Sequence, residues 1–158
     1  MKKYSIELKW ALVFVGMSLA WMGLERLFGL HDTYIDRHAT FTNFVAIPAI
    51  AIFVLALLDK RENYYGGIMT YMQGFVSGMI ITLIVTILSP ITQLITSLVI
   101  TPHYFDNAIQ YAVSEGKSTQ ANAEAYFNLN SYIFQGLIGA PIMGFITTVI
   151  VAFFTKKS

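Results

Sequence analysis

Residues 66–101 of this chain read GGIMTYMQGFVSGMIITLIVTILSPITQLITSLVIT and are the strongest indication of its fold. It lies inside a longer region, 63–105, in which none of the 43 positions holds Asp, Glu, Lys or Arg. About 20 apolar residues suffice to cross the ~30 Å hydrocarbon core of a bilayer, and soluble core helices rarely carry such long uncharged runs. The sequence therefore predicts an integral membrane protein.

The composition agrees with a membrane location. Of the 158 residues, 56% are apolar and only 12% are charged, and the mean hydropathy is +0.61; about a quarter of a typical soluble domain is charged. The formal net charge of +1 and the lack of a basic stripe predict no nucleic-acid partner. The absence of cysteine excludes disulfides, thiolate metal sites and cysteine nucleophiles.

Four hydrophobic segments predict an all-α membrane bundle formed by a single domain over residues 1–158. The expected spans cover about 6–30, 39–58, 68–89 and 132–154. The first segment continues beyond the small residues at 18–20, which favours an uncleaved signal anchor. The charged, glycine-ended stretch 59–67 predicts a tight turn. Proline within or at the end of three spans predicts kinks at Pro48, Pro90 and Pro141.

Residues 91–100 predict an amphipathic arm after the third span. Apolar side chains recur at helical spacing, and Gln93, Thr96 and Ser97 fall on the opposite side. The arm either extends the span or bends to lie near the interface. Thr101-Pro102 and a second helix start at residues 118–119 predict two cap helices outside the lipid, at 102–115 and 119–130.

The distribution of cations predicts the orientation. Seven of the ten Lys and Arg residues fall at one end of the predicted bundle: Lys2, Lys3, Lys9, Lys60, Arg61, Lys156 and Lys157. Because cytoplasmic loops carry the excess of Lys and Arg, both termini are expected in the cytoplasm and the cap outside it.

Small residues recur every four positions on the third and fourth spans. On the third they are Thr70, Gly74, Gly78 and Thr82, and on the fourth Gly136, Ala140 and Gly144. Such faces let helix backbones approach closely in lipid. We expect them to pack the third span against the fourth within one chain; the alternative is a homodimer interface.

Kinked helices also allow a transport hypothesis. A polar path would be lined by Thr86, Ser89, Gln93 and Gln135. No acid or base is expected at the middle of the bilayer, which argues against a proton-coupled carrier.

Titratable residues gather near the outer end of the first span. Glu25 and Arg26 lie in its last turns, where they are expected to reach the headgroups; the alternative is that Glu25 faces the bundle. The residues His31, Asp32, Asp36, His38 and His103 are expected to be solvated loop residues. Imidazoles with carboxylates are also a zinc or transition-metal donor set, which leaves a metal-binding sensor as an alternative.

The chain carries no catalytic motif: it has no Gly-x-Ser-x-Gly, no His-Glu-x-x-His and no phosphate-binding glycine loop. We therefore predict no enzymatic activity and no cofactor. The favoured hypothesis is an accessory, scaffold or envelope component. The alternatives are a small oligomeric transporter or channel and the metal-binding sensor. The expected partners of the chain are the lipid bilayer, further copies of the chain or other membrane proteins.

Several phrases of the sequence together resemble a known family. They are KKYSIELKWAL, LDKRENYYGGIMTYMQGF, ITLIVTILSPITQ, ITPHYF and QGLIGAPIMG. In this combination the chain resembles the family called domain of unknown function 4199, small four-span proteins of Gram-negative bacteria. The resemblance covers nearly the whole chain and implies a location in the bacterial inner membrane. It implies no substrate, cofactor or catalytic residue.

Overall fold

The computed structural model describes residues 4–157 as a set of helices joined by short turns. The α-helices are α1 (Ser5–Leu27), α2 (Ile35–Phe41), α3 (Ala46–Asn63), α4 (Tyr71–Ile95), α5 (Tyr104–Ser114), α6 (Gln120–Tyr126) and α7 (Leu129–Thr155). A 3-10 turn, η1 (Thr42–Val45), joins α2 to α3, and a π-helical turn, η2 (Thr96–Ile100), ends α4. The predicted all-α fold is confirmed.

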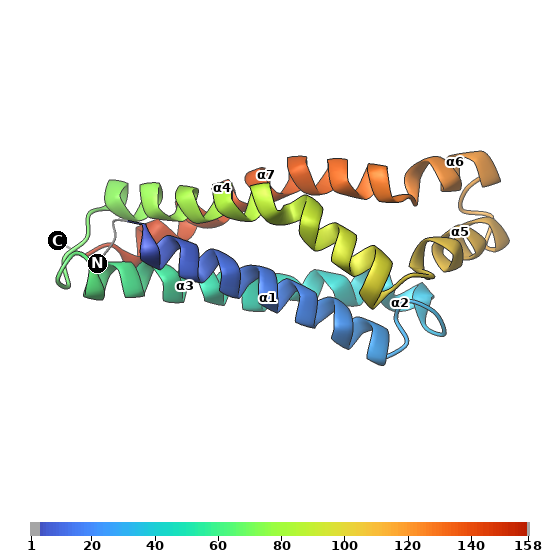
Figure 1. Ribbon diagram of the computed structural model, residues 1–158, viewed down its shortest axis with the longest axis horizontal. Coiled ribbons are helices and arrows are strands. Elements are labelled where there is room, and N and C mark those ends of the chain that lie inside the picture. The colour runs from blue at the N-terminus through green and yellow to red at the C-terminus, as the bar shows by residue number, and fades with distance from the viewer. Residues whose placement is uncertain (1–3, 158) are drawn as a thin grey trace.

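The long helices α1, α3, α4 and α7 run side by side as an elongated bundle (Figure 1). The described chain starts and ends at the same end of the bundle, beside the α3–α4 turn. There the backbones of Met69 and Lys157 exchange two hydrogen bonds of 2.9 Å. The short helices α2, α5 and α6 lie at the opposite end, so α5 and α6 form a cap beyond the bundle (Figure 1).

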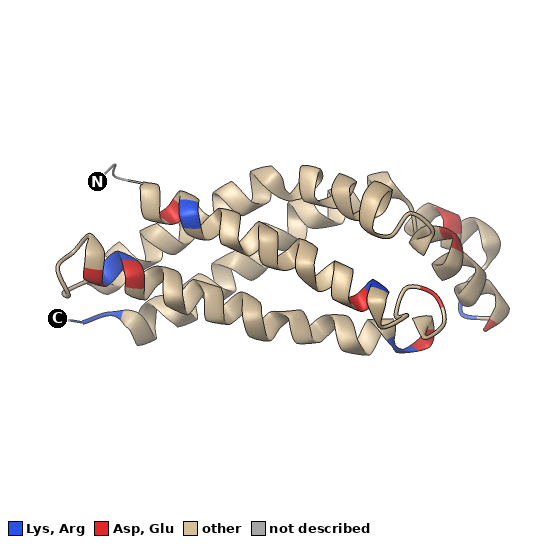
Figure 2. Ribbon diagram, turned by 60° about the horizontal axis from the view of Figure 1, so that its bottom comes forward, with Lys and Arg blue, Asp and Glu red and all other residues tan. Residues whose placement is uncertain are grey.

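Four helical segments are long and apolar enough to cross a membrane: Ser5–Leu27, Ile35–Asn63, Tyr71–Ile100 and Leu129–Thr155. Charged residues gather at the two ends of the bundle and leave its middle free of them (Figure 2). Since an unpaired charge is costly in hydrocarbon, this separation is what a bilayer imposes on a multi-pass protein. The prediction of a four-span membrane bundle is therefore confirmed.

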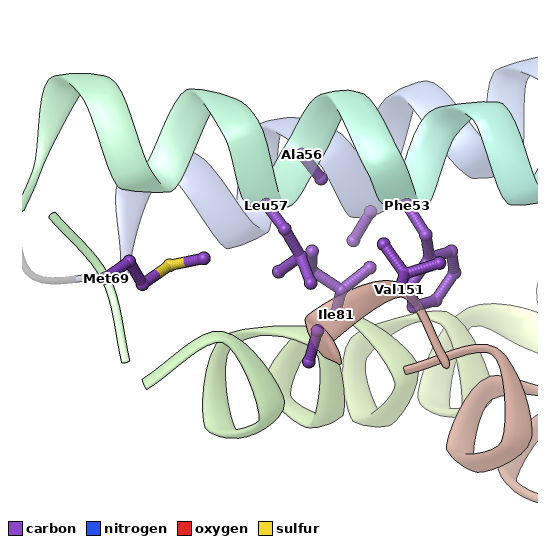
Figure 3. Packing of buried hydrophobic residues seen from close by; sticks show 8 residues of the cluster. Phe53, Ala56, Leu57, Met69, Ile81 and Val151 are labelled. Atoms are coloured by element: carbon purple, nitrogen blue, oxygen red, sulfur yellow. The ribbon is translucent and has the colours of Figure 1, made fainter. Parts of the chain in front are cut away.

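The buried apolar core occupies the half of the bundle nearest the termini. It is built from Ala11 of α1, Phe53, Ala56 and Leu57 of α3, Met69 and Ile81 beside and on α4, and Val151 and Ala152 of α7 (Figure 3). The other half contributes few fully buried apolar side chains. The helices are thus packed tightly at the terminal end and less tightly toward the cap.

Close backbone approach joins α4 to α7, the most extensive helix contact in the bundle. A Cβ atom added to Gly78 would lie 2.7 Å from the hydroxyl oxygen of Thr148. In a reciprocal arrangement, Gly144 faces Thr82 with no room for a Cβ atom. Each glycine therefore receives the side chain of the partner helix, the kind of contact by which helices associate in lipid.

Several helix boundaries differ from the sequence-based expectation; the second cap helix, for example, expected over 119–130, ends at Tyr126. The predicted turn at 59–67 begins later, because α3 continues through the charged residues to Asn63. Asp59 accepts hydrogen bonds from Lys9 and from Trp10, at 2.7 Å in the second case, and these contacts hold the last turns of α3 against α1. The first cap helix starts at Tyr104, with no side-chain cap from Thr101.

The three prolines of the spans occupy two kinds of position in their helices. Pro48 lies in the first turn of α3, where a missing N–H costs little, and the irregularity falls upstream in η1. Pro90 and Pro141 lie inside α4 and α7, which continue through them. Residues 91–95 therefore extend α4, and only 96–100 leave regular α-helix geometry. Thr96 and Ser97 are buried there while Leu98 and Val99 face outward.

Candidate metal centre

A chain reversal after α1 creates the candidate site. Gly29 adopts a positive φ of 73°, a conformation that glycine reaches without a steric penalty. The turn is closed by a hydrogen bond of 2.7 Å from the amide of Tyr34 to the carbonyl oxygen of Gly29. This reversal carries His31 back beside Glu25, and the start of α2 then brings His38 to the same place.

Glu25 is buried in the structure, with 2% of its surface exposed. Its Oε1 accepts a hydrogen bond of 2.6 Å from the indole Nε1 of Trp21, one turn earlier on α1. Its Oε2 lies 3.0 Å from Nε2 of His31 and 3.2 Å from Nε2 of His38. The expectation that Glu25 reaches the headgroups is therefore wrong: the reversal at Gly29 covers the carboxylate before it can extend outward.

Helix α5 covers the histidines from the cap side. The Tyr104 ring lies 5.2 Å from the His31 ring and 5.1 Å from the His38 ring, and the two imidazole rings are 5.1 Å apart. The Tyr104 hydroxyl lies 3.2 Å from that of Tyr132 on α7. Asn107 donates a hydrogen bond of 2.9 Å to the backbone carbonyl of His31. The site is thus held by α1, α2, α5 and α7 together.

Burial raises the pKa of Tyr104, and the nearby Glu25 carboxylate raises it further, while the hydrogen bond with Tyr132 opposes the shift. Its hydroxyl oxygen lies 3.5 Å from Nδ1 of His38, where it can accept a hydrogen bond from the Nδ1–H of the tautomer whose Nε2 is free to bind a metal. A partner on the remote nitrogen is how ligating imidazoles are commonly oriented.

The ligand atoms have the spacing of a metal site. Glu25, His31 and His38 each offer one ligand atom, and all three atoms lie within 4.8 Å of one another. Zinc bonds of about 2.0–2.1 Å at tetrahedral angles separate ligand atoms by about 3.3 Å. The measured separations of 3.0 and 3.2 Å from the carboxylate to the two imidazoles lie close to that value.

Two ring nitrogens of the site lack a hydrogen-bond partner among residues 4–157. His31 is 3% exposed, and its Nδ1 has no hydrogen-bond partner among residues 4–157. Nε2 of His38 is likewise buried and outside hydrogen-bonding geometry, although it lies near the carboxylate. Two imidazoles thus converge on a single carboxylate oxygen, only one of them with the geometry of a hydrogen bond.

The other residues of the predicted donor set lie apart from this group. Asp32, Asp36 and His103 are exposed. Asp32 and His103 line a hollow of about 80 Å³ that also reaches His31, on the cap side of the site. Of the predicted donor set, the structure brings together His31 and His38, and the carboxylate beside them is that of Glu25. The available signal was an acidic residue in the last turn of an apolar helix, followed closely by two histidines.

The predicted polar path is bonded mostly along the helices that carry it. Thr86 donates to the carbonyl oxygen of Thr82, and Ser89 to that of Thr86, both at 2.8 Å. Gln93 donates to Ser97 and Gln135 to Ser131. Ser89 and Gln93 do line a hollow of about 200 Å³ among α1, α4 and α7, but Thr86 and Gln135 are not among its lining residues.

The predicted packing residues divide into two groups. Gly74, Gly78, Thr82 and Gly144 lie at the contact between α4 and α7, and Gly136 faces Ser89 at an ordinary distance. Thr70 instead caps the start of α4 by accepting a hydrogen bond from the amide of Gln73. Ala140 lines the hollow beside Gln93.

A second buried polar group was not predicted. Glu7 and Lys60 are 1% and 3% exposed, and Nζ of Lys60 lies 2.8 Å from Oε1 of Glu7. Ser77 donates to the same oxygen at 2.8 Å. The group joins α1, α3 and α4 at the terminal end. Its residues lie in separate parts of the sequence, so spacing gave no signal for it.

These features define the chain as a four-span α-helical membrane protein with a cap and a buried Glu-His-His cluster at the cap end. It belongs to the family described as protein of unknown function (DUF4199), whose model matches residues 9–157. No curated protein and no solved structure matches the chain.

Proposed function

We propose that this chain is a non-enzymatic membrane component that binds one Zn²⁺ ion through Glu25, His31 and His38. One observation carries the proposal: three ligand atoms of the types that zinc prefers lie within 4.8 Å of one another, the carboxylate oxygen at 3.0 and 3.2 Å from the two imidazole nitrogens, and two of the three residues are at least 97% buried. The donor set of two imidazoles and one carboxylate suits zinc better than calcium or magnesium, which prefer oxygen ligands throughout.

The ion would act by fixing the cap to the bundle. Its ligands come from the end of α1, the following turn and α2, and Tyr104 and Asn107 of α5 contact the same histidines. Zinc would therefore cross-link the α1–α2 connection beneath the cap. This supports a role in which metal occupancy controls the order of the cap, as in a sensor or a regulated scaffold.

The rival interpretation is a structural ion pair without metal. A protonated imidazole beside Glu25 would also offset the cost of burying the carboxylate. The two interpretations differ in their response to zinc, because an ion pair needs no metal and binds none.

We expect purified protein in detergent micelles at neutral pH to bind one Zn²⁺ per chain. Replacing His38 with glutamine should weaken zinc binding by at least about 100-fold. Losing a residue that only orients a metal ligand costs up to about 100-fold in affinity, and losing a ligand should cost at least as much. Titration calorimetry measures both values. Zinc at 100 times its dissociation constant should also stabilise the wild type by about 2.7 kcal/mol.

The matched control is His103→Gln. His103 is a histidine at the same end of the molecule, but it is exposed and lies outside the cluster. Its replacement should leave the affinity unchanged. Absence of zinc binding by the folded wild type, or equal losses in the two variants, would leave the ion-pair interpretation standing.

We further propose that this site lies outside the cytoplasm, in the periplasm if the membrane is a bacterial inner membrane. Lys60 and Arg61 lie in the last turn of α3, and Lys156 and Lys157 follow α7, at the terminal end of the bundle; the cluster lies on the end of α1, the following turn and α2, at the cap end (Figure 1). The excess of cations favours the cytoplasm for the terminal end.

A reporter that works only outside the cytoplasm tests this orientation. Inserted at Gly116, which lies in the exposed turn between α5 and α6, it should be active; fused after residue 158, it should be inactive. A cytoplasmic reporter at the same two positions serves as the control and should give the opposite pattern. Activity of the exported reporter at the C-terminus would reverse the assignment.

A transport function receives less support. The side chains of Thr86, Ser89 and Gln135, which were expected to line a path, donate hydrogen bonds to groups of their own helices, α4 and α7. The tightest part of the bundle, where Gly78 meets Thr148 and Gly144 meets Thr82, has no room even for an added Cβ atom.

A further inference from the structure

A second concave site lies on the lipid-facing side of α1, close to the cap end. It is a pocket of about 430 Å³, within the range of small-molecule sites. It opens between the last turns of α1, the turn that follows them, α2 and η1. Its lining residues are Trp21, Leu24, Glu25, Phe28, Leu30, Tyr34, Arg37, Phe41 and Phe44.

The walls of this pocket are apolar and exposed. Phe28 is 70% exposed, and Leu24, Phe41 and Phe44 are each close to half exposed. Leu24 belongs to one candidate span, and Phe41 and Phe44 belong to the next. The medium in contact with these walls in a bilayer is therefore the outer part of the acyl-chain region.

The pocket has a cationic rim. The Arg37 side chain is 63% exposed and forms a loose, exposed ion pair with Asp36, whose carboxylate oxygen lies 3.9 Å from its Nε, so the guanidinium keeps N–H donors free of a hydrogen bond to Asp36. The guanidinium stands over the Tyr34 ring at 5.5 Å, which fixes its direction. A guanidinium held in this way presents several N–H donors to a phosphate.

The acidic residue of the pocket does not oppose an anion at the rim. Both carboxylate oxygens of Glu25 already have contacts inside the protein, Oε1 with the Trp21 indole N–H and Oε2 with the His31 imidazole. The carboxylate is 2% exposed, whereas the Arg37 guanidinium extends outward. Among the residues that line the pocket, the accessible charge is therefore that of Arg37.

We propose that this pocket binds one anionic phospholipid, with an acyl chain along the aromatic wall and the phosphate on Arg37. The apolar wall matches the acyl chain of such a lipid, and the outward-facing Arg37 matches its phosphate. In a bilayer the phosphate likewise lies farther out than the acyl chain. The proposal is independent of metal binding, since none of its contacts requires an ion at the histidines.

Fluorescence quenching tests the proposal, because Trp21 lines the pocket and the chain has two tryptophans. The Trp10→Phe variant leaves Trp21 as the only reporter. It is reconstituted into phosphatidylcholine vesicles with rising fractions of phosphatidylglycerol brominated on its acyl chains. Half-maximal quenching should occur at about fivefold lower mole fraction than with brominated phosphatidylcholine. One Arg or Lys near an anionic membrane surface contributes about 1 kcal/mol of binding free energy, which corresponds to about this factor in affinity.

Arg37→Gln in the same background should remove the difference between the two brominated lipids. Lys117→Gln, which removes an exposed cation outside the pocket, should preserve it. The reverse single-tryptophan variant, Trp21→Phe, reports from Trp10 at the other end of α1 and should show no headgroup preference.

Quenching of Trp21 that follows mole fraction equally for both headgroups, and is unchanged by Arg37→Gln, would overturn the proposal. So would a pocket filled by a second copy of the chain, which would shield Trp21 from both brominated lipids. Circular dichroism of each variant confirms that helix content is intact before quenching is compared.

Discussion

Replacing Lys60 with methionine should destabilise the protein by about 3–5 kcal/mol, the usual cost of removing one partner from a buried ion pair. The substitution leaves Glu7 with 1% exposure and only the Ser77 hydroxyl on Oε1, while its Oε2 already lacks a partner among residues 4–157. Unfolding of the purified protein in mixed micelles with increasing denaturing detergent measures the change.

The double variant Glu7→Gln with Lys60→Met should be more stable than Lys60→Met alone. Removing both charges abolishes the uncompensated carboxylate, and the glutamine oxygen still accepts from Ser77. The double-mutant cycle then gives the coupling between the two residues.

Glu62→Gln is the matched control for the Glu7→Gln substitution. Glu62 lies two positions beyond Lys60 in an exposed pair with Arg61, so its replacement should change stability by no more than about 0.5 kcal/mol. An effect of Lys60→Met as small as this would show that the buried pair contributes nothing to the bundle.

The second large effect is expected at the crossing of α4 and α7. Gly144→Ala should cost about 1–3 kcal/mol, because the new methyl group would overlap the Thr82 side chain and force the two helices apart. The loss is measured in the same unfolding assay, and a second Thr82→Ala substitution should recover part of it by removing the overlapping atoms.

Gly139→Ala supplies the control on the same helix. A Cβ atom at Gly139 meets nothing within 4 Å, so alanine should be neutral or should stabilise α7 by up to about 1 kcal/mol through helix propensity. If both alanine variants behaved alike, the close approach of α4 and α7 would not govern stability.

Much of the fold followed from the sequence through hydrophobicity. The uncharged run 63–105 and the apolar segments on either side of it predicted four membrane helices, and the small residues at Gly78, Thr82 and Gly144 predicted which helices approach closely. Helix ends were less predictable. The extension of α3 to Asn63 depends on contacts of Asp59 with Lys9 and Trp10, far away in the sequence.

The candidate metal centre was only half visible in the sequence. His31 and His38 lie close together in a polar connection, so their proximity was foreseeable. The role of Glu25 was not, because a carboxylate in the last turn of a span can reach the headgroups at little cost. Its burial required the reversal at Gly29 and the cover provided by Tyr104 from a much later helix.

Local composition was enough to predict that this chain crosses a membrane four times, because transfer of a long apolar run into lipid depends on the run itself. The pairing of the polar groups inside the bundle depends instead on how the helices pack. The Glu25–His31–His38 cluster and the Glu7–Lys60 pair each join different helices. A buried charge is tolerated only where partners converge, and convergence is a property of packing.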